Sequence, residues 1–139
     1  MTKKQIVKFV EKVTECNVYI NFYMGRCPHG DGYYAYVFRD KPKVIYIYLK
    51  SLNDCSLAMQ KQTLLHEVGH AMTLWRCKNK SEEEFRAQMW GINKAKKLGM
   101  HQIVRTMLRT MELWTYSDWK SCERRYRMAG MIAIKKKII

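Results

Sequence analysis

The spacing of apolar residues changes along the chain and separates helical from extended segments. Residues 2–15 carry apolar side chains at helical spacing between lysines and glutamates, which predicts an amphipathic helix. Three runs rich in tyrosine and β-branched residues then favour strands, and a loop of turn-forming residues separates the first two. We therefore expect a small, mostly antiparallel sheet built from Val18–Met24, Tyr33–Arg39 and Lys43–Lys50.

The second half of the chain returns to helical spacing. A helix with a broad apolar face is predicted over about 56–75, with Asn53 or Asp54 as its N-cap. Ser81 begins the next predicted helix, and Gly99 is a typical residue to end it. This order places two long helices directly after the predicted sheet.

Two further helices, about Met100–Leu113 and Ser117–Ile134, close the predicted fold, and Lys135–Lys137 is expected to be a frayed tail. The 139 residues contain two prolines, no repeats and no low-complexity linker, so no domain boundary is indicated. We therefore predict one α+β domain over residues 1–139, within the usual size of a compact domain. Its small sheet packs on the 56–75 helix and the helix that follows.

The segment His66-Glu67-Val68-Gly69-His70 lies within the predicted 56–75 helix. Histidines four residues apart project from one face of a helix, so both imidazoles can bind one metal ion. Glu67 is rotated by about 100° from His66, which places its carboxylate beside the metal, where it can deprotonate a water held there. The spacing predicts zinc, with His66 and His70 as ligands and Glu67 as general base.

A catalytic zinc ion takes three protein ligands and keeps a fourth position for water. The third ligand must therefore come from another segment. Glu82, Glu83 and Glu84 begin the next predicted helix after a short turn. Pairing of the two helices would return one of these carboxylates to the histidines, and the spacing alone leaves all three open.

The combination resembles the gluzincin zinc metallopeptidases, especially the minigluzincins and the catalytic core of the CAAX prenyl proteases. In those families a glutamate ligand begins a Glu-x-x-Ala-Asp stretch on the helix after the motif, and this chain reads Glu84-Phe85-Arg86-Ala87-Gln88. The resemblance covers about residues 57–99. It implies Glu84 as the third ligand, one zinc ion per chain, a zincin-like fold and hydrolysis of peptide bonds.

Gln88 departs from the family pattern, which usually has an aspartate there that supports the first histidine. In gluzincins an extended substrate pairs with the edge of a strand, and the resemblance implies this role for Lys43–Lys50. The residue that stabilises the oxyanion does not follow from the motif. Tyr116, Tyr126 and His101 are unranked candidates for it.

Several of these residues also have purely structural explanations. Ser81 and Glu84 match a Ser-x-x-Glu capping box, which would account for Glu84 without a metal. Cys27 and His29 could form half of a second metal site, but a turn beside Pro28 explains this loop equally well. We expect core packing, and no cofactor contact, from Trp90, Trp114 and Trp119.

The chain is strongly basic, with 26 Lys+Arg against 12 Asp+Glu and a net charge of +14. Such a charge attracts acidic partners, so nucleic acid is a candidate partner besides a protein or peptide substrate. No nucleic-acid-binding motif accompanies the charge. Two alternative functions follow: a non-catalytic zinc-containing binding or regulatory module, which Gln88 mildly supports, and a protease docked on nucleic acid through its basic surface.

The cysteines and the N-terminus indicate the compartment. Five cysteines lie far apart without a Cys-x-x-Cys pair, which favours reduced thiols. Residues 1–11 lack the apolar core of a signal peptide, and no run approaches the roughly 20 apolar residues of a membrane helix. We expect a soluble, cytoplasmic protein that does not bind membranes.

Overall fold

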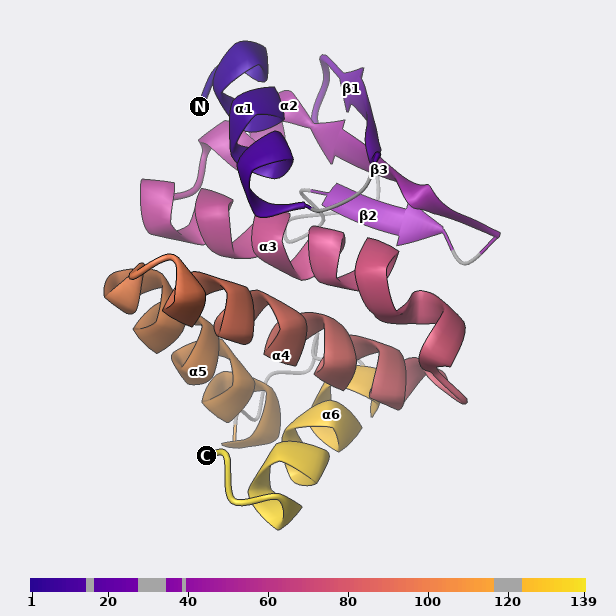
Figure 1. Ribbon diagram of the computed structural model, residues 1–139, viewed down its shortest axis with the longest axis vertical. Helices are drawn as coiled ribbons and strands as arrows, with labels where there is room; N and C mark the ends of the chain where they lie inside the picture. The colour runs from indigo at the N-terminus through magenta and orange to yellow at the C-terminus, as the bar shows by residue number, and fades with distance from the viewer. Residues whose placement is uncertain (15–16, 28–34, 39, 117–123) are drawn as a thin grey trace.

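A computed structural model describes residues 1–14, 17–27, 35–38, 40–116 and 124–139. It is an α+β fold with a three-stranded sheet and six helices of the α type in the described part of the chain (Figure 1). The elements, in chain order, are α1 (Lys3–Val13), β1 (Tyr19–Tyr23), β2 (Ala35–Phe38), β3 (Lys41–Tyr48), α2 (Leu49–Asn53), α3 (Leu57–Thr73), a 3-10 turn (Leu74–Arg76), α4 (Lys80–Lys97), α5 (His101–Tyr116) and α6 (Arg124–Lys135).

The sheet is mixed, with the strand order β1-β3-β2. β1 runs parallel to β3, and β2 runs antiparallel to it. The predicted strands are therefore present, but the prediction of a mostly antiparallel sheet is wrong. The central strand β3 carries Ile45 and Ile47, which are fully buried, and α3 packs against this strand.

The central place of β3 also changes the prediction for substrate binding. Both edges of this strand are paired, so its backbone has no open edge for an extended peptide. The assignment of Lys43–Lys50 as the substrate-binding strand is therefore wrong. Among the described strands, the open edges belong to β1 and β2.

The helices form layers on one side of the sheet. α3 packs against β3 and β2, and α4 lies beside α3 on the side away from the sheet (Figure 1). α5 and α6 pack on α4 in turn, while α1 lies next to the sheet. The motif helix α3 is thereby enclosed, and ten of its residues are buried. Its burial on both sides explains the broad apolar face in the sequence.

Two helix caps differ from the prediction. Ser56 caps α3, where its side chain accepts a hydrogen bond from the Met59 backbone. The predicted cap Asn53 instead accepts a hydrogen bond from the N-terminal amine. Asn79, rather than Ser81, caps α4 through a hydrogen bond from the Glu82 backbone. In each case the observed cap lies one to three residues from the expected one, and the element itself is confirmed.

The C-terminal helices were predicted with nearly correct bounds. α5 extends to Tyr116, and α6 is described from Arg124, so the predicted start at Ser117 lies outside the described residues. The chain after Lys135 is not frayed: Lys137 adopts a positive φ of 57°, and the Ile138 backbone donates to the Ala133 carbonyl. This is the hydrogen-bonding pattern of a Schellman C-cap. Within the described residues, no helix combines the length and apolarity needed to cross a lipid bilayer.

Candidate metal centre

The three predicted metal ligands come together between two helices. His66 and His70 project from α3, and Glu84 projects from the first turns of α4. The short connection after α3 returns the chain alongside it as α4 (Figure 1). Glu84 thereby lies close to both histidines. Among the residues that the structure describes, this is the one group of three with metal-ligating side chains close enough to bind an ion.

The ligand atoms form a compact triangle. The Oε2 atom of Glu84 lies 2.9 Å from Nε2 of His66 and 3.2 Å from Nε2 of His70. The two Nε2 atoms are 3.1 Å apart. All three side chains are buried, with Glu84 only 4% exposed. The cluster can therefore bind a metal ion through two nitrogens and one oxygen.

These distances fit a tetrahedral metal ion. Ligand atoms at roughly 2.0–2.1 Å from zinc lie about 3.3 Å from one another in a tetrahedron. The observed separations of 2.9, 3.2 and 3.1 Å would need to widen by a few tenths of an ångström at most. Two imidazoles and one carboxylate, with a fourth position left open, are the donors that catalytic zinc sites use.

The cluster is also charged in a way that favours a cation. Burial opposes ionisation of His66, but its hydrogen bond to Glu84 and the charge of that carboxylate raise the pKa of His66 to about 9. Burial likewise opposes ionisation of Glu84, and the hydrogen bonds from both histidines overcome it and lower the pKa of Glu84. A bound cation would replace the proton that the three side chains otherwise share.

Glu67 lies beside the cluster without joining it. Its side chain is buried at 8% exposure, and burial raises the pKa of Glu67 while the neighbouring histidines partly offset this effect. A carboxylate with a raised pKa next to a metal position is suited to accept a proton and release it again. The predicted separation of roles between Glu67 and the ligands is thus compatible with the geometry.

Gln88 supports the first histidine in place of an aspartate. Its Nε2 donates to the Met107 carbonyl at 2.9 Å, so its Oε1 faces His66 and can only accept. The Nδ1 atom of His66 lies 2.8 Å from this oxygen and must therefore carry a proton. This fixes the tautomer that leaves Nε2 available for a metal. The departure from the family pattern keeps the supporting hydrogen bond and removes one negative charge.

We expect Gln88→Met to weaken metal binding by about 10- to 100-fold, because it keeps the buried volume and removes the acceptor from His66. Zinc affinity measured by competition with a chromophoric chelator would test this expectation. Gln102→Met is the control, because Gln102 is an exposed residue on α5. Equal affinity in the Gln88 variant and the wild type would show that this hydrogen bond does not support the site.

The structure resolves the alternatives for the third ligand. Because Asn79 caps α4, the capping-box explanation of Glu84 is wrong. Glu82 accepts a hydrogen bond from the Lys78 backbone and pairs with Arg86, away from the cluster. Glu83 is not part of the group of metal-ligating side chains either. Glu84 alone of the three reaches both histidines.

The helical pair α5–α6 places three residues near the site, of which only Tyr126 was a candidate from the sequence. Trp114 meets the His66 ring edge-on at a centroid distance of 5.9 Å, and Tyr126 packs against Trp114 at 5.0 Å. The Nε atom of Arg125 lies 3.6 Å from Oε1 of Glu84, the oxygen that does not face the histidines. Trp114 packs against the hydrophobic core as expected, and it also contacts His66.

The oxyanion candidates are thereby distinguished by position. Tyr126 lies near the cluster through Trp114. His101 begins α5 and is exposed, and 13 residues of helix place it about 20 Å along the axis from Trp114. Tyr116 is 70% exposed at the other end of α5. Geometry therefore favours Tyr126 over His101 and Tyr116.

The remaining sequence candidates lie elsewhere or outside the described residues. Cys27 is a buried free thiol, and Cys55 and Cys77 are also free, as predicted for these three. His29, Cys16, Cys122 and Trp119 fall outside the described residues, so the second metal site stays untested. Trp90 packs against the hydrophobic core as expected.

Comparison with known protein families, curated proteins and solved structures finds no match for this chain.

Proposed function

We propose that this protein is a zinc-dependent metallopeptidase of the gluzincin type. The observation that supports the proposal is the meeting of Glu84 Oε2 from α4 with both histidine Nε2 atoms from α3, at distances of 2.9 and 3.2 Å. A histidine pair alone has many explanations. A buried carboxylate from a second helix in the same place, with Glu67 beside it, is the arrangement that this chemistry requires.

Each residue of the centre then has a distinct task. Zinc, when bound, lowers the pKa of water and polarises the scissile carbonyl. Glu67 accepts the proton of the attacking water and delivers it to the leaving amine. Gln88 holds His66 in the tautomer that exposes Nε2. Burial of these side chains strengthens the electrostatic interactions among them.

We infer that β2, rather than β3, pairs with the extended substrate. Among the described strands, β2 pairs only with β3, so its other edge is available. It also packs against α3, the helix that carries the histidines, whereas β1 lies on the far side of β3. A peptide added to the β2 edge would run along the motif helix, with backbone hydrogen bonds that are independent of its sequence.

The test is zinc content per chain in wild-type protein and in Glu84→Ala and His70→Ala variants, purified identically. We expect about one zinc in the wild type and much less in both variants, because each loses one of three ligands. Glu82→Ala is the control, since Glu82 lies on the same helix but outside the cluster. Retention of zinc in Glu84→Ala would exclude it as a ligand, and absence of zinc from reconstituted wild type would remove the case for this enzyme.

The two alternative functions, a non-catalytic module and a protease docked on nucleic acid, have less support than peptide hydrolysis. A non-catalytic module was favoured by Gln88, but Gln88 makes the same supporting hydrogen bond that the aspartate would make. Docking on nucleic acid rests on the net charge of +14 alone. Four tyrosines of the sheet, Tyr23, Tyr36, Tyr46 and Tyr48, stack on one another. Peptide hydrolysis is therefore the function to test first.

A further inference from the structure

The edge of the outer strand β1 lacks the residues that usually protect the open edge of a sheet. It is the terminal strand of the sheet, and it pairs only with β3 among the described strands. Its sequence, Tyr19-Ile20-Asn21-Phe22-Tyr23, has strong β-propensity and contains no charge, proline or glycine. Natural proteins usually protect an open edge with lysine, proline or a bulge. β1 has none of these within its five residues.

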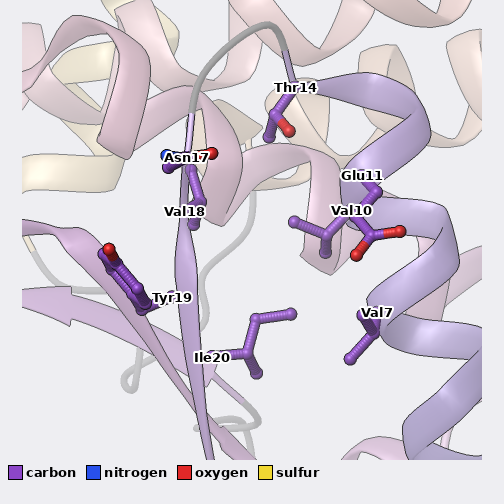
Figure 2. A pocket seen from close by; sticks show the side chains of 8 residues that line it. All are labelled: Val7, Val10, Glu11, Thr14, Asn17, Val18, Tyr19 and Ile20. Atoms are coloured by element: carbon purple, nitrogen blue, oxygen red, sulfur yellow. The ribbon is translucent and has the colours of Figure 1, made fainter.

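A groove runs between this strand and α1 (Figure 2). Its volume is about 650 Å³, within the range of pockets that bind ligands. Apolar side chains from both sides point into it. Val7 and Val10 come from α1, Ile20 comes from β1, and Val18 directly precedes β1. The polar side chains that line it are Glu11, Thr14, Asn17 and Tyr19.

Edge and groove together fit an extended chain. A strand added beside β1 would hydrogen-bond to the backbone of β1. Because side chains alternate along a strand, every second residue of the added chain would face the apolar lining of the groove. The same alternation is present in β1, where Ile20 and Phe22 are half-buried and Tyr19 and Tyr23 are exposed.

The charge around the groove indicates which chain would bind. Glu11 is the one charged residue among those that line the groove, but α1 as a whole carries four lysines and one glutamate, and β1 carries no charge. Lys3, one helical turn before Val7, reaches across to β1, with Nζ 5.6 Å from the centroid of the Phe22 ring. With a net charge of +14 on the whole chain, a second copy would be repelled, whereas an acidic segment would be attracted.

We propose that the groove between α1 and β1 docks an extended segment of a partner protein, one that alternates apolar residues and is flanked by acidic ones, as an added strand on β1. The site is separate from the metal centre, because its lining residues lie on α1, on β1 and next to them, whereas the three candidate ligands lie on α3 and α4. Docking there does not depend on the proposed peptidase activity.

The probe is a labelled peptide, Glu-Asp-Val-Thr-Val-Thr-Val-Asp-Glu, and its counterpart with lysines in place of the four acids. Binding is followed by fluorescence anisotropy with the full-length Glu67→Gln variant, so that the peptide stays intact. We expect the acidic peptide to bind at least tenfold more tightly than the basic one. Absence of binding by the acidic peptide, or equal binding by both, would overturn the proposal.

Backbone pairing is tested with two methylated peptides, one N-methylated at the valines and one at the threonines. Alternate amides of an added strand point toward and away from β1. One methylated peptide should therefore lose at least tenfold in affinity while the other keeps it. If both keep or both lose affinity alike, the peptide does not bind as a strand.

The location is tested with Val7→Glu, which should weaken acidic-peptide binding at least tenfold. Leu113→Glu is the matched control, because it makes the same kind of change at an exposed site on α5. Lys4→Glu alters only an exposed position on α1 and should weaken binding severalfold even if Val7→Glu does not fold. Unchanged binding in Lys4→Glu, or a concentration-dependent dimer that blocks peptide binding, would show that the groove has another occupant.

Discussion

Glu67→Gln is expected to bind zinc as the wild type does and to hydrolyse peptides about 100- to 10,000-fold more slowly, the usual contribution of a general base. Glutamine has the same shape as glutamate, so the buried pocket beside His66 and His70 stays filled. It cannot accept the proton of the attacking water at neutral pH. The loss should therefore appear in kcat rather than in KM, since a proton acceptor acts only in the transition state.

The measurement pairs zinc content with initial rates of cleavage of a quenched fluorescent peptide library. Glu112→Gln serves as the control, because Glu112 is a partly exposed glutamate on α5 that pairs with Arg109. A Glu67→Gln variant that keeps both its zinc and full activity would contradict the assignment of the general base. Loss of zinc together with activity would instead place Glu67 among the residues that hold the metal.

The motif helix and its neighbour were predictable because the relevant signals are local. Histidines four residues apart face the same side of any helix, whatever surrounds it. The third ligand needed more, since Glu82, Glu83 and Glu84 share the same local pattern. Which of the three reaches the histidines depends on the angle at which α4 returns along α3. From the sequence, only the resemblance to the gluzincins selected Glu84. In the structure Glu84 contacts the histidines and Glu82 accepts a hydrogen bond from the Lys78 backbone, whereas Glu83 is outside the group of possible metal ligands.

The sheet was predicted strand by strand but not in its order. Strand-forming residues give propensity without saying which strands are neighbours. The two loops on either side of β2 made an antiparallel meander the simplest expectation, whereas β1 pairs in parallel with β3. Ile45 and Ile47 of β3 are fully buried, but β3 also contains two lysines and a proline, so its composition did not mark it as the central strand.

Of the residues that α5 and α6 bring to the site, only Tyr126 was a candidate from the sequence, and it was not ranked above Tyr116 and His101. Trp114, Arg125 and Tyr126 reach the site only because these helices pack against α4. Nothing in an amphipathic pattern distinguishes an aromatic residue that fills a core from one that forms the wall of a site. For Gln88, by contrast, its place four residues after Glu84 was recognised, and the structure explains how an amide performs the task there.

Gly69 has a larger role than its place inside a helix suggested. Glycine is usually an unfavourable residue inside a helix. A Cβ atom built there would lie 2.2 Å from the Ala87 carbonyl oxygen and 2.8 Å from its carbonyl carbon. These are backbone atoms of α4, which cannot move without moving the helix. Gly69 therefore sets how closely α3 and α4 approach, and with it the distance from Glu84 to the histidines.

We expect Gly69→Ala to destabilise the metal-free protein by about 1–2 kcal/mol. Alanine favours a helix over glycine by roughly 0.5–1 kcal/mol, but overpacking against a fixed backbone costs about 1–3 kcal/mol or more. Separation of the helices would also move Glu84, one turn before Ala87, away from His66 and His70. Zinc affinity should fall together with stability, as measured by urea unfolding in chelator and by zinc competition.

Gly91→Ala distinguishes this effect from a general intolerance of alanine. A Cβ atom there would meet Met107 Cε at 2.5 Å, but this atom is the end of a flexible side chain. The methionine can turn aside, so we expect a change within about 1 kcal/mol and unaltered zinc affinity. If Gly69→Ala proved as stable as Gly91→Ala and kept its zinc, the close approach of α3 and α4 would not be what positions Glu84. A selective loss in Gly69→Ala would show that the metal site depends on a contact between backbones.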